Sequence, residues 1–172
     1  SSIAMGYQAK ACGQYSISLG QQNYAHGKNS FAIGTKSYAN NRYSIAIGRE
    51  VISRGNSSVA LGYKTLSLTW GSTAIGHATT ASGRFSTALG KGTVALGRHS
   101  ITMGTETTAS GAGTTAMGTL TTASGDFSTA MGSYTVASAI DSTAMGTRTK
   151  AKSYAETALG LYNKDVTPIS ST

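Results

Sequence analysis

The chain has 172 residues, a formal net charge of +8, 22 glycines and one proline. Only 12% of its residues are charged and 39% are apolar, which excludes a disordered chain. No apolar run approaches the roughly 18 residues of a membrane-spanning helix, and the single cysteine, Cys12, excludes an internal disulfide and a cysteine-built metal site.

A five-residue pattern, small–any–small–apolar–Gly, recurs along the chain at a constant spacing of 14 residues. Its glycines are Gly6, Gly20, Gly34, Gly48, Gly62, Gly76, Gly90, Gly104, Gly118, Gly132, Gly146 and Gly160. A weaker copy follows half a period later, as at residues 79–83 and 107–111. Alternating segments bounded by glycine predict short strands, because no helix tolerates a glycine every seven residues. We therefore predict an all-β solenoid of twelve 14-residue coils, each with two five-residue segments joined by two-residue corners.

The two faces of each predicted strand carry different residues, since residues i, i+2 and i+4 share a face. One face of the first segment carries Ser, Ala and Gly, and the second segment carries Ala or Ser, as at Ala39 and Ser53. We expect these small residues to fill a thin interior. The opposite face of the second segment is mostly polar, as at His26 and Asn40.

The opposite face of the first segment is apolar in every coil. The twelve residues of this apolar stripe are Met5, Leu19, Ile33, Ile47, Leu61, Ile75, Leu89, Met103, Met117, Met131, Met145 and Leu159. At about 4.8 Å per coil the stripe would run about 55 Å, which a soluble monomer does not leave exposed. We predict that identical chains cover it around a symmetry axis; the periodicity leaves two or three chains open.

The Ser-x-Ala-apolar-Gly segments, such as those ending at Gly34 and Gly62, resemble the head repeats of trimeric autotransporter adhesins of the YadA type over residues 2–160. The resemblance implies a left-handed parallel β-roll, a homotrimer with the apolar stripe as its core, and a head at the bacterial cell surface. It also implies binding to extracellular matrix proteins of the collagen, fibronectin or laminin type, or to other cells.

Domain boundaries follow from the repeat: residues 1–160 form the head, and residues 161–172 an exit segment towards a neck, stalk or next domain. Because the chain begins at Ser1 within the pattern, we expect it to be a piece of a longer protein, anchored in the outer membrane through other regions. We expect no membrane contact within this piece. Residues 161–168 do not match a recognised neck, and a trimeric tail-fibre segment of a phage or injection system is therefore the alternative.

Basic residues and tyrosines gather in the first half of the chain. Tyr24 and Tyr38 occupy equivalent positions on the polar sheet of successive coils and should stack. The predicted ligand-binding surface consists of Lys10, Tyr24, His26, Lys28, Lys36, Tyr38, Arg42, Tyr43 and Arg54. A stabilising ladder with ordinary solubilising charge would give the same pattern, so this alternative stays open.

The expected partners are host matrix proteins or cell-surface glycans, with nonspecific heparin binding from the net positive charge. The basic residues lie on several ridges rather than in one groove, so we expect no specific nucleic-acid site. The six acids form no pair, and His26, His77 and His99 lack zinc-ligand spacing; we expect no enzyme, metal or cofactor. Regular threonines, such as Thr108 and Thr122, suggest an ice-binding solenoid as a third hypothesis, although Thr-x-Thr is not present in every coil.

Overall fold

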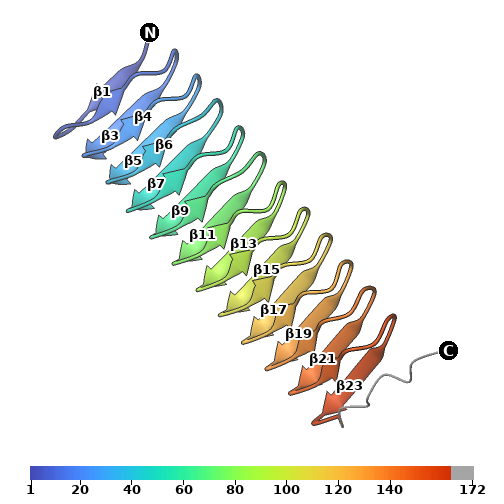
Figure 1. Cartoon of the computed structure of the whole chain (residues 1–172). Helices are drawn as coiled ribbons and strands as arrows, with labels where there is room; N and C mark the ends of the chain where they lie inside the picture. Colours follow the sequence, from blue (N-terminus) through green and yellow to red (C-terminus); the bar gives the residue numbers. More distant parts are fainter. Residues whose placement is uncertain (164–172) are drawn as a thin grey trace.

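The computed structural model describes residues 1–163, which form one elongated stack of coils with residues 1 and 163 at opposite ends of the stack (Figure 1). Twelve strands form one sheet and eleven strands form a second. All neighbouring strands are parallel, and each pairs with the strand one coil further along the chain, as in the pairing of β5 (Phe31–Thr35) with β7 (Ile45–Arg49). The fold is therefore an all-β parallel β-solenoid with 14-residue coils, as predicted.

The twelve strands of the first sheet, called here the long-strand sheet, have five residues each except the first, which has three. They are β1 (Ile3–Met5), β3 (Ile17–Gln21), β5 (Phe31–Thr35), β7 (Ile45–Arg49), β9 (Val59–Tyr63), β11 (Thr73–His77), β13 (Thr87–Lys91), β15 (Ile101–Thr105), β17 (Thr115–Thr119), β19 (Thr129–Ser133), β21 (Thr143–Thr147) and β23 (Thr157–Leu161).

The eleven strands of the second sheet, called here the short-strand sheet, have two residues each. They are β2 (Lys10–Ala11), β4 (Tyr24–Ala25), β6 (Tyr38–Ala39), β8 (Ile52–Ser53), β10 (Leu66–Ser67), β12 (Thr80–Ala81), β14 (Val94–Ala95), β16 (Thr108–Ala109), β18 (Thr122–Ala123), β20 (Val136–Ala137) and β22 (Lys150–Ala151).

The number of complete turns is about eleven rather than the twelve predicted. The first segment is present twelve times, but the second segment of a twelfth coil would fall on residues 164–172, outside the described residues. The predicted exit segment, residues 161–172, also lies almost entirely outside them. Its first residue, Leu161, is the last residue of β23.

The interior consists of small side chains from both sheets, as predicted. Ala32 and Ala46 on the long strands and Ala25 and Ala39 on the short strands have no solvent-accessible surface. The largest fully buried side chain is Val51. Because alanine and serine extend so little from the backbone, the two sheets can lie close together.

The glycine of the repeat does not face this interior, so the prediction that it shares the inward face with Ser and Ala was wrong. Gly62 is exposed and Gly34 is half-buried. The φ of Gly34 is +120°, and a Cβ built on it would collide with the carbonyl oxygen of Gly48 in the next coil. Glycine is required here by backbone conformation and close approach.

The two corners of a coil differ in length, whereas the sequence predicted two residues for each. Corner A, from a long strand to the next short strand, has two residues, such as Lys36 and Ser37. Corner B, from a short strand to the next long strand, has five, such as residues 40–44. The second segment is shortened accordingly, although the Asn40 N–H still donates to Ser53 O at 2.9 Å and so extends the ladder beyond the assigned strand.

Candidate functional site

The apolar stripe lies on the outer face of the long-strand sheet. Its residues stack in register, as Ile33 does on Ile47 and Ile47 on Leu61. In the single chain the stripe remains accessible: 38% of the Ile47 and of the Met103 surface is exposed. The described residues therefore present a continuous apolar row along the whole stack.

A second apolar row runs beside the stripe in the first five coils, two residues before each stripe residue. Its members are Ile3, Ile17, Phe31, Ile45 and Val59, which also stack in register. From Thr73 onwards the same position holds threonine, with Ile101 as the exception. The outer face is thus wider and more apolar in the first five coils. Only the stripe was predicted from the sequence, although strict strand alternation indicates this second row as well.

The predicted tyrosine ladder is present on the outer face of the short-strand sheet. The rings of Tyr24 and Tyr38 stack with centroids 5.2 Å apart and planes within 6°. His26 stacks on Tyr24 at 6.2 Å and 5°, and the Lys10 ammonium lies 5.3 Å from the centre of the Tyr24 ring. These four residues, from three successive coils, form one connected aromatic and cationic cluster.

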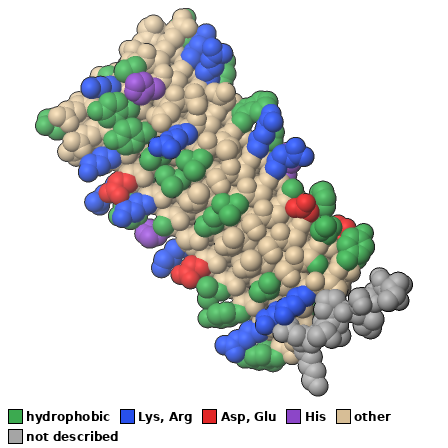
Figure 2. Space-filling view, viewed as in Figure 1, with side chains coloured by type: hydrophobic (Ala, Val, Ile, Leu, Met, Phe, Trp, Pro, Cys, Tyr) green, Lys and Arg blue, Asp and Glu red, His purple; other side chains and the backbone are tan. Residues whose placement is uncertain are grey.

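The other predicted ligand-binding residues lie on the outer face of the short-strand sheet, at corner B and at corner A. Arg54 follows β8 on the same outer face as His26, two coils further along. Lys28, Arg42 and Tyr43 are exposed at corner B, beside this face. Lys36 is at corner A, at the other edge of the coil, and does not join the cluster. Most Lys and Arg side chains in Figure 2 lie along the two long edges of the visible face.

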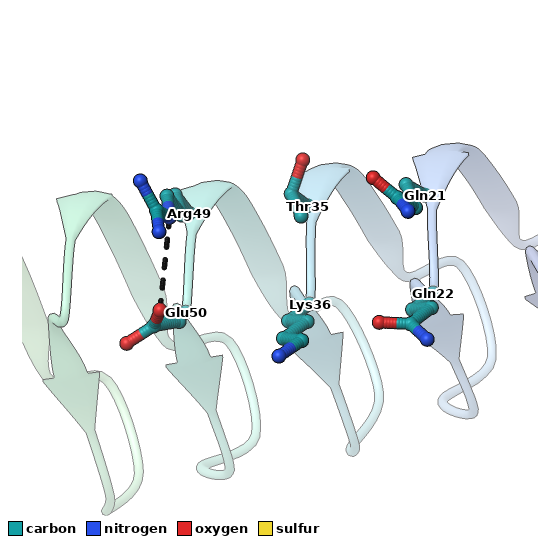
Figure 3. A pocket seen from close by; sticks show the side chains of 6 residues that line it. All are labelled: Gln21, Gln22, Thr35, Lys36, Arg49 and Glu50. Carbon is teal, nitrogen blue, oxygen red and sulfur yellow. Dashed lines mark ion pairs between the residues drawn. The ribbon is translucent and has the colours of Figure 1, made fainter.

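Lys36 instead lines a shallow polar pocket along corner A of three coils (Figure 3). The pocket residues are Gln21, Gln22, Thr35, Lys36, Arg49 and Glu50. Arg49 Nε lies 3.6 Å from a Glu50 carboxylate oxygen, and Lys64 Nζ lies 3.9 Å from the other oxygen. Both pairs are substantially solvent-exposed, so each contributes little to stability.

The family of the chain follows from a comparison with protein-family models. The model of the YadA head domain repeat, built of two copies, matches residues 1–23, 25–50, 71–93, 95–121, 109–135, 123–149 and 137–154. These stretches cover more than half of the chain. The chain belongs to the YadA head family. A search of curated proteins found no match.

YadA heads are parts of bacterial surface adhesins of the trimeric autotransporter class, which are anchored in the outer membrane and are not enzymes. The predicted family, its adhesin class and the absence of enzymatic activity are thereby confirmed. Within residues 1–163 of this YadA head no three His, Cys, Asp or Glu side chains gather as a metal site, and no helix could span a membrane. The free thiol of Cys12 is exposed.

This head also has an aromatic and cationic group at corner B that was not predicted from the sequence. Trp70, Arg84, Phe85 and His99 come from three successive coils and contact one another through their rings and the guanidinium group. Their spacing along the sequence is one period, 14 residues, give or take one. A search for aromatic and basic residues repeated at that spacing would have found them.

Proposed function

We propose that this adhesin head is a left-handed β-roll that assembles as a homotrimer with the apolar stripe as its core. The observation that supports the trimer is the uninterrupted stripe from Met5 to Leu159 on one outer face, widened by a second apolar row in the first five coils. Large exposed apolar surfaces mark interaction sites on soluble proteins. A symmetry axis lets three identical stripes cover one another.

The same proposal assigns ligand binding to the short-strand face of the N-terminal half. The Tyr24–Tyr38 stack, with His26 stacked on Tyr24, offers flat apolar surface, and the exposed charges of Lys10, Lys28, Arg42 and Arg54 lie on the same or neighbouring coils. Tyrosine and arginine are favoured where few contacts provide most of the binding energy. The ligand class we propose is a host extracellular matrix protein of the collagen, fibronectin or laminin type.

Attachment would be multivalent. Each trimer carries the surface three times on a rigid rod, and linked copies raise the effective concentration of each site for a repetitive ligand. Weak contacts at single patches then add up to firm adhesion.

The experiment is binding of the purified chain to immobilised collagen, fibronectin and laminin over a series of salt concentrations. We expect saturable binding that weakens with salt, because exposed charges are screened. Neutralising Lys28, Arg42 and Arg54 together to glutamine should abolish it, while neutralising Arg148 to glutamine, at the far end of the stack, should leave it unchanged.

Retention of binding in the triple variant would refute the assignment of this surface. If no matrix protein bound at all, the head would act as a spacer, with recognition elsewhere in the protein. The oligomeric state, measured by light scattering on the same samples, tests the trimer independently.

A further inference from the structure

Corner B carries a ridge of aromatic and cationic side chains in the middle of the stack. This ridge, called here the Trp70 ridge, consists of Trp70, Arg84, Phe85, Arg98 and His99, from three successive coils. Trp70 and Phe85 are 48% and 41% exposed. The ridge lies in other coils than the Tyr24–Tyr38 stack, and Arg54, one coil before Trp70, is the proposed matrix-binding residue that precedes it most closely along the chain.

Direct contacts hold four of the five side chains in one row. The rings of Trp70 and Phe85 lie 5.2 Å apart at 45°, and Phe85 stacks on His99 at 5.4 Å and 12°. The Arg84 guanidinium carbon lies 4.3 Å from the Trp70 ring centre and 5.5 Å from that of Phe85. A guanidinium that stacks through its plane keeps its N–H donors at the edge, free for an anion.

The backbone positions this row of side chains. Gly71 takes a φ of +63°, and the Phe85 ring lies over it so closely that a Cβ on Gly71 would come within 2.5 Å of Phe85 Cδ1. The Phe85 N–H donates to Trp70 O at 3.0 Å, and the His99 N–H donates to Arg84 O at 2.9 Å. The ladder therefore fixes the positions from which the ridge side chains project.

The positive charge of the ridge is not neutralised by a neighbouring acid. The ion pairs among the described residues both involve Glu50, which lies at corner A. Arg84 and Arg98 therefore present their charges to solvent from adjacent coils.

We propose that the Trp70 ridge binds an acidic carbohydrate. A sugar ring would lie on the aromatic surface of Trp70 and Phe85, and its carboxylate or sulfate would accept hydrogen bonds from the edges of Arg84 and Arg98. The ridge spans two coil spacings, about 10 Å, which suits one or two sugar units. A stable protein partner would instead have to bury roughly 800 Å² of surface on each side of the interface.

A second site at the same corner of this chain serves as an internal control for the Trp70 ridge. Three coils beyond Phe85 along the same corner, Phe127 lies over Gly113, whose φ is +65°, with its Cδ1 2.8 Å from the position of a Cβ. The residues beside Phe127 are acidic, Asp126 and Asp141. Gly113 and Phe127 thus repeat the arrangement of Gly71 and Phe85, but the charged residues beside them are negative. This second site should therefore not bind an acidic sugar.

Trp70 is the only tryptophan of the chain, so its fluorescence reports on this ridge alone. The test is a titration of the purified chain with hexasaccharides of hyaluronan, which carries carboxylates, of heparin, which also carries sulfates, and of neutral maltose units. We expect a saturable change in Trp70 fluorescence with one or both acidic sugars and none with the neutral one. Which acidic sugar binds distinguishes carboxylate from sulfate recognition.

Substitutions at exposed side chains localise the effect. Arg84→Gln and Arg98→Gln should each raise the apparent Kd at least about tenfold, the equivalent of about 1.4 kcal/mol. Phe127→Ala and the triple variant of Lys28, Arg42 and Arg54 should leave it unchanged. The melting temperature of each variant verifies that the fold is intact.

Three results would overturn the proposal: no fluorescence change with either acidic sugar, an equal change with the neutral sugar, or equal weakening by the triple variant. The last would mean that net charge alone attracts the sugar. Loss of matrix-protein binding in the triple variant with an unchanged Trp70 titration would separate this site from the proposed adhesin surface.

Discussion

The side-chain amide of Asn23 donates a hydrogen bond to the carbonyl oxygen of Gly34 in the next coil at 2.7 Å. It also donates to Leu19 O at 2.6 Å, and its Oδ1 accepts from the Ser37 N–H at 2.8 Å. Asn23 is fully buried at the inward position of corner A, so one side chain satisfies three backbone groups and joins two coils.

Replacing Asn23 with alanine should therefore destabilise the head. The substitution leaves buried backbone groups without partners, which costs about 2–3 kcal/mol. For a chain of this size the melting temperature should fall by about 5–10 °C, measured by circular dichroism. A shift within about 1 °C would show that water replaces the amide at this corner.

Other coils carry threonine at the same inward position, where the hydroxyl has no partner. Thr79 Oγ1 is buried and unpaired, and a valine, Val51, already occupies this position two coils earlier. Thr79→Val removes a buried unsatisfied group while keeping the shape, so the melting temperature should rise by about 2–4 °C.

The matched control for Thr79→Val is Thr114→Val. Thr114 Oγ1 is buried but donates to Gly111 O at 2.8 Å, so the same change there removes a hydrogen bond and should lower the melting temperature. Equal effects of the two substitutions would contradict the proposed difference in hydroxyl pairing.

Two glycines with positive φ should respond differently to alanine. Gly34→Ala forces a Cβ against Gly48 O at a φ of +120°, and it should lower the unfolding free energy by about 3 kcal/mol or more. Gly92 has a φ of +63°, and the equivalent position one coil earlier holds Ala78 at +54°. Gly92→Ala should therefore cost only the left-handed backbone penalty of about 1–2 kcal/mol. Chemical denaturation compares the two; a mild effect at Gly34 would contradict the close approach of the coils.

Ile47→Asp tests the apolar stripe. In a trimer it would bury an unpaired charge at the seam, so the oligomer should dissociate or unfold. Ser110→Asp introduces the same charge at an exposed position after β16 and should leave the oligomer intact. Sedimentation velocity measures both. A trimeric Ile47→Asp variant with unchanged melting would exclude this face as the core.

The stacking of the coils could be predicted from the sequence because each coil repeats the same residue types at the same positions. Ala32, Ala46 and Ala60 recur at one period and are buried, and Ile33, Ile47 and Leu61 recur beside them and face outwards. Alternation decides which side chains share a face, and an unbroken period leaves one register for neighbouring coils.

The direction of the glycines and the length of corner B could not be read in this way. Alternation assigns Gly34 to the inward face, but its φ of +120° departs from the extended conformation on which alternation depends. Residues such as Lys36 and Tyr43 adopt left-handed conformations, with φ of +54° and +58°, that their side chains do not favour. The hydrogen bonds between stacked coils hold them there, and such bonds exist only in the assembled fold.

By itself the sequence determined the period, the strand faces, the small-residue interior and the apolar stripe, because these depend on residue type and spacing alone. Only the tertiary structure decided which distant side chains meet. Arg84 stacks on Trp70, whereas Lys36 is separated from Arg42, because the backbone turns at two unequal corners. The positions of those turns depend on contacts between coils.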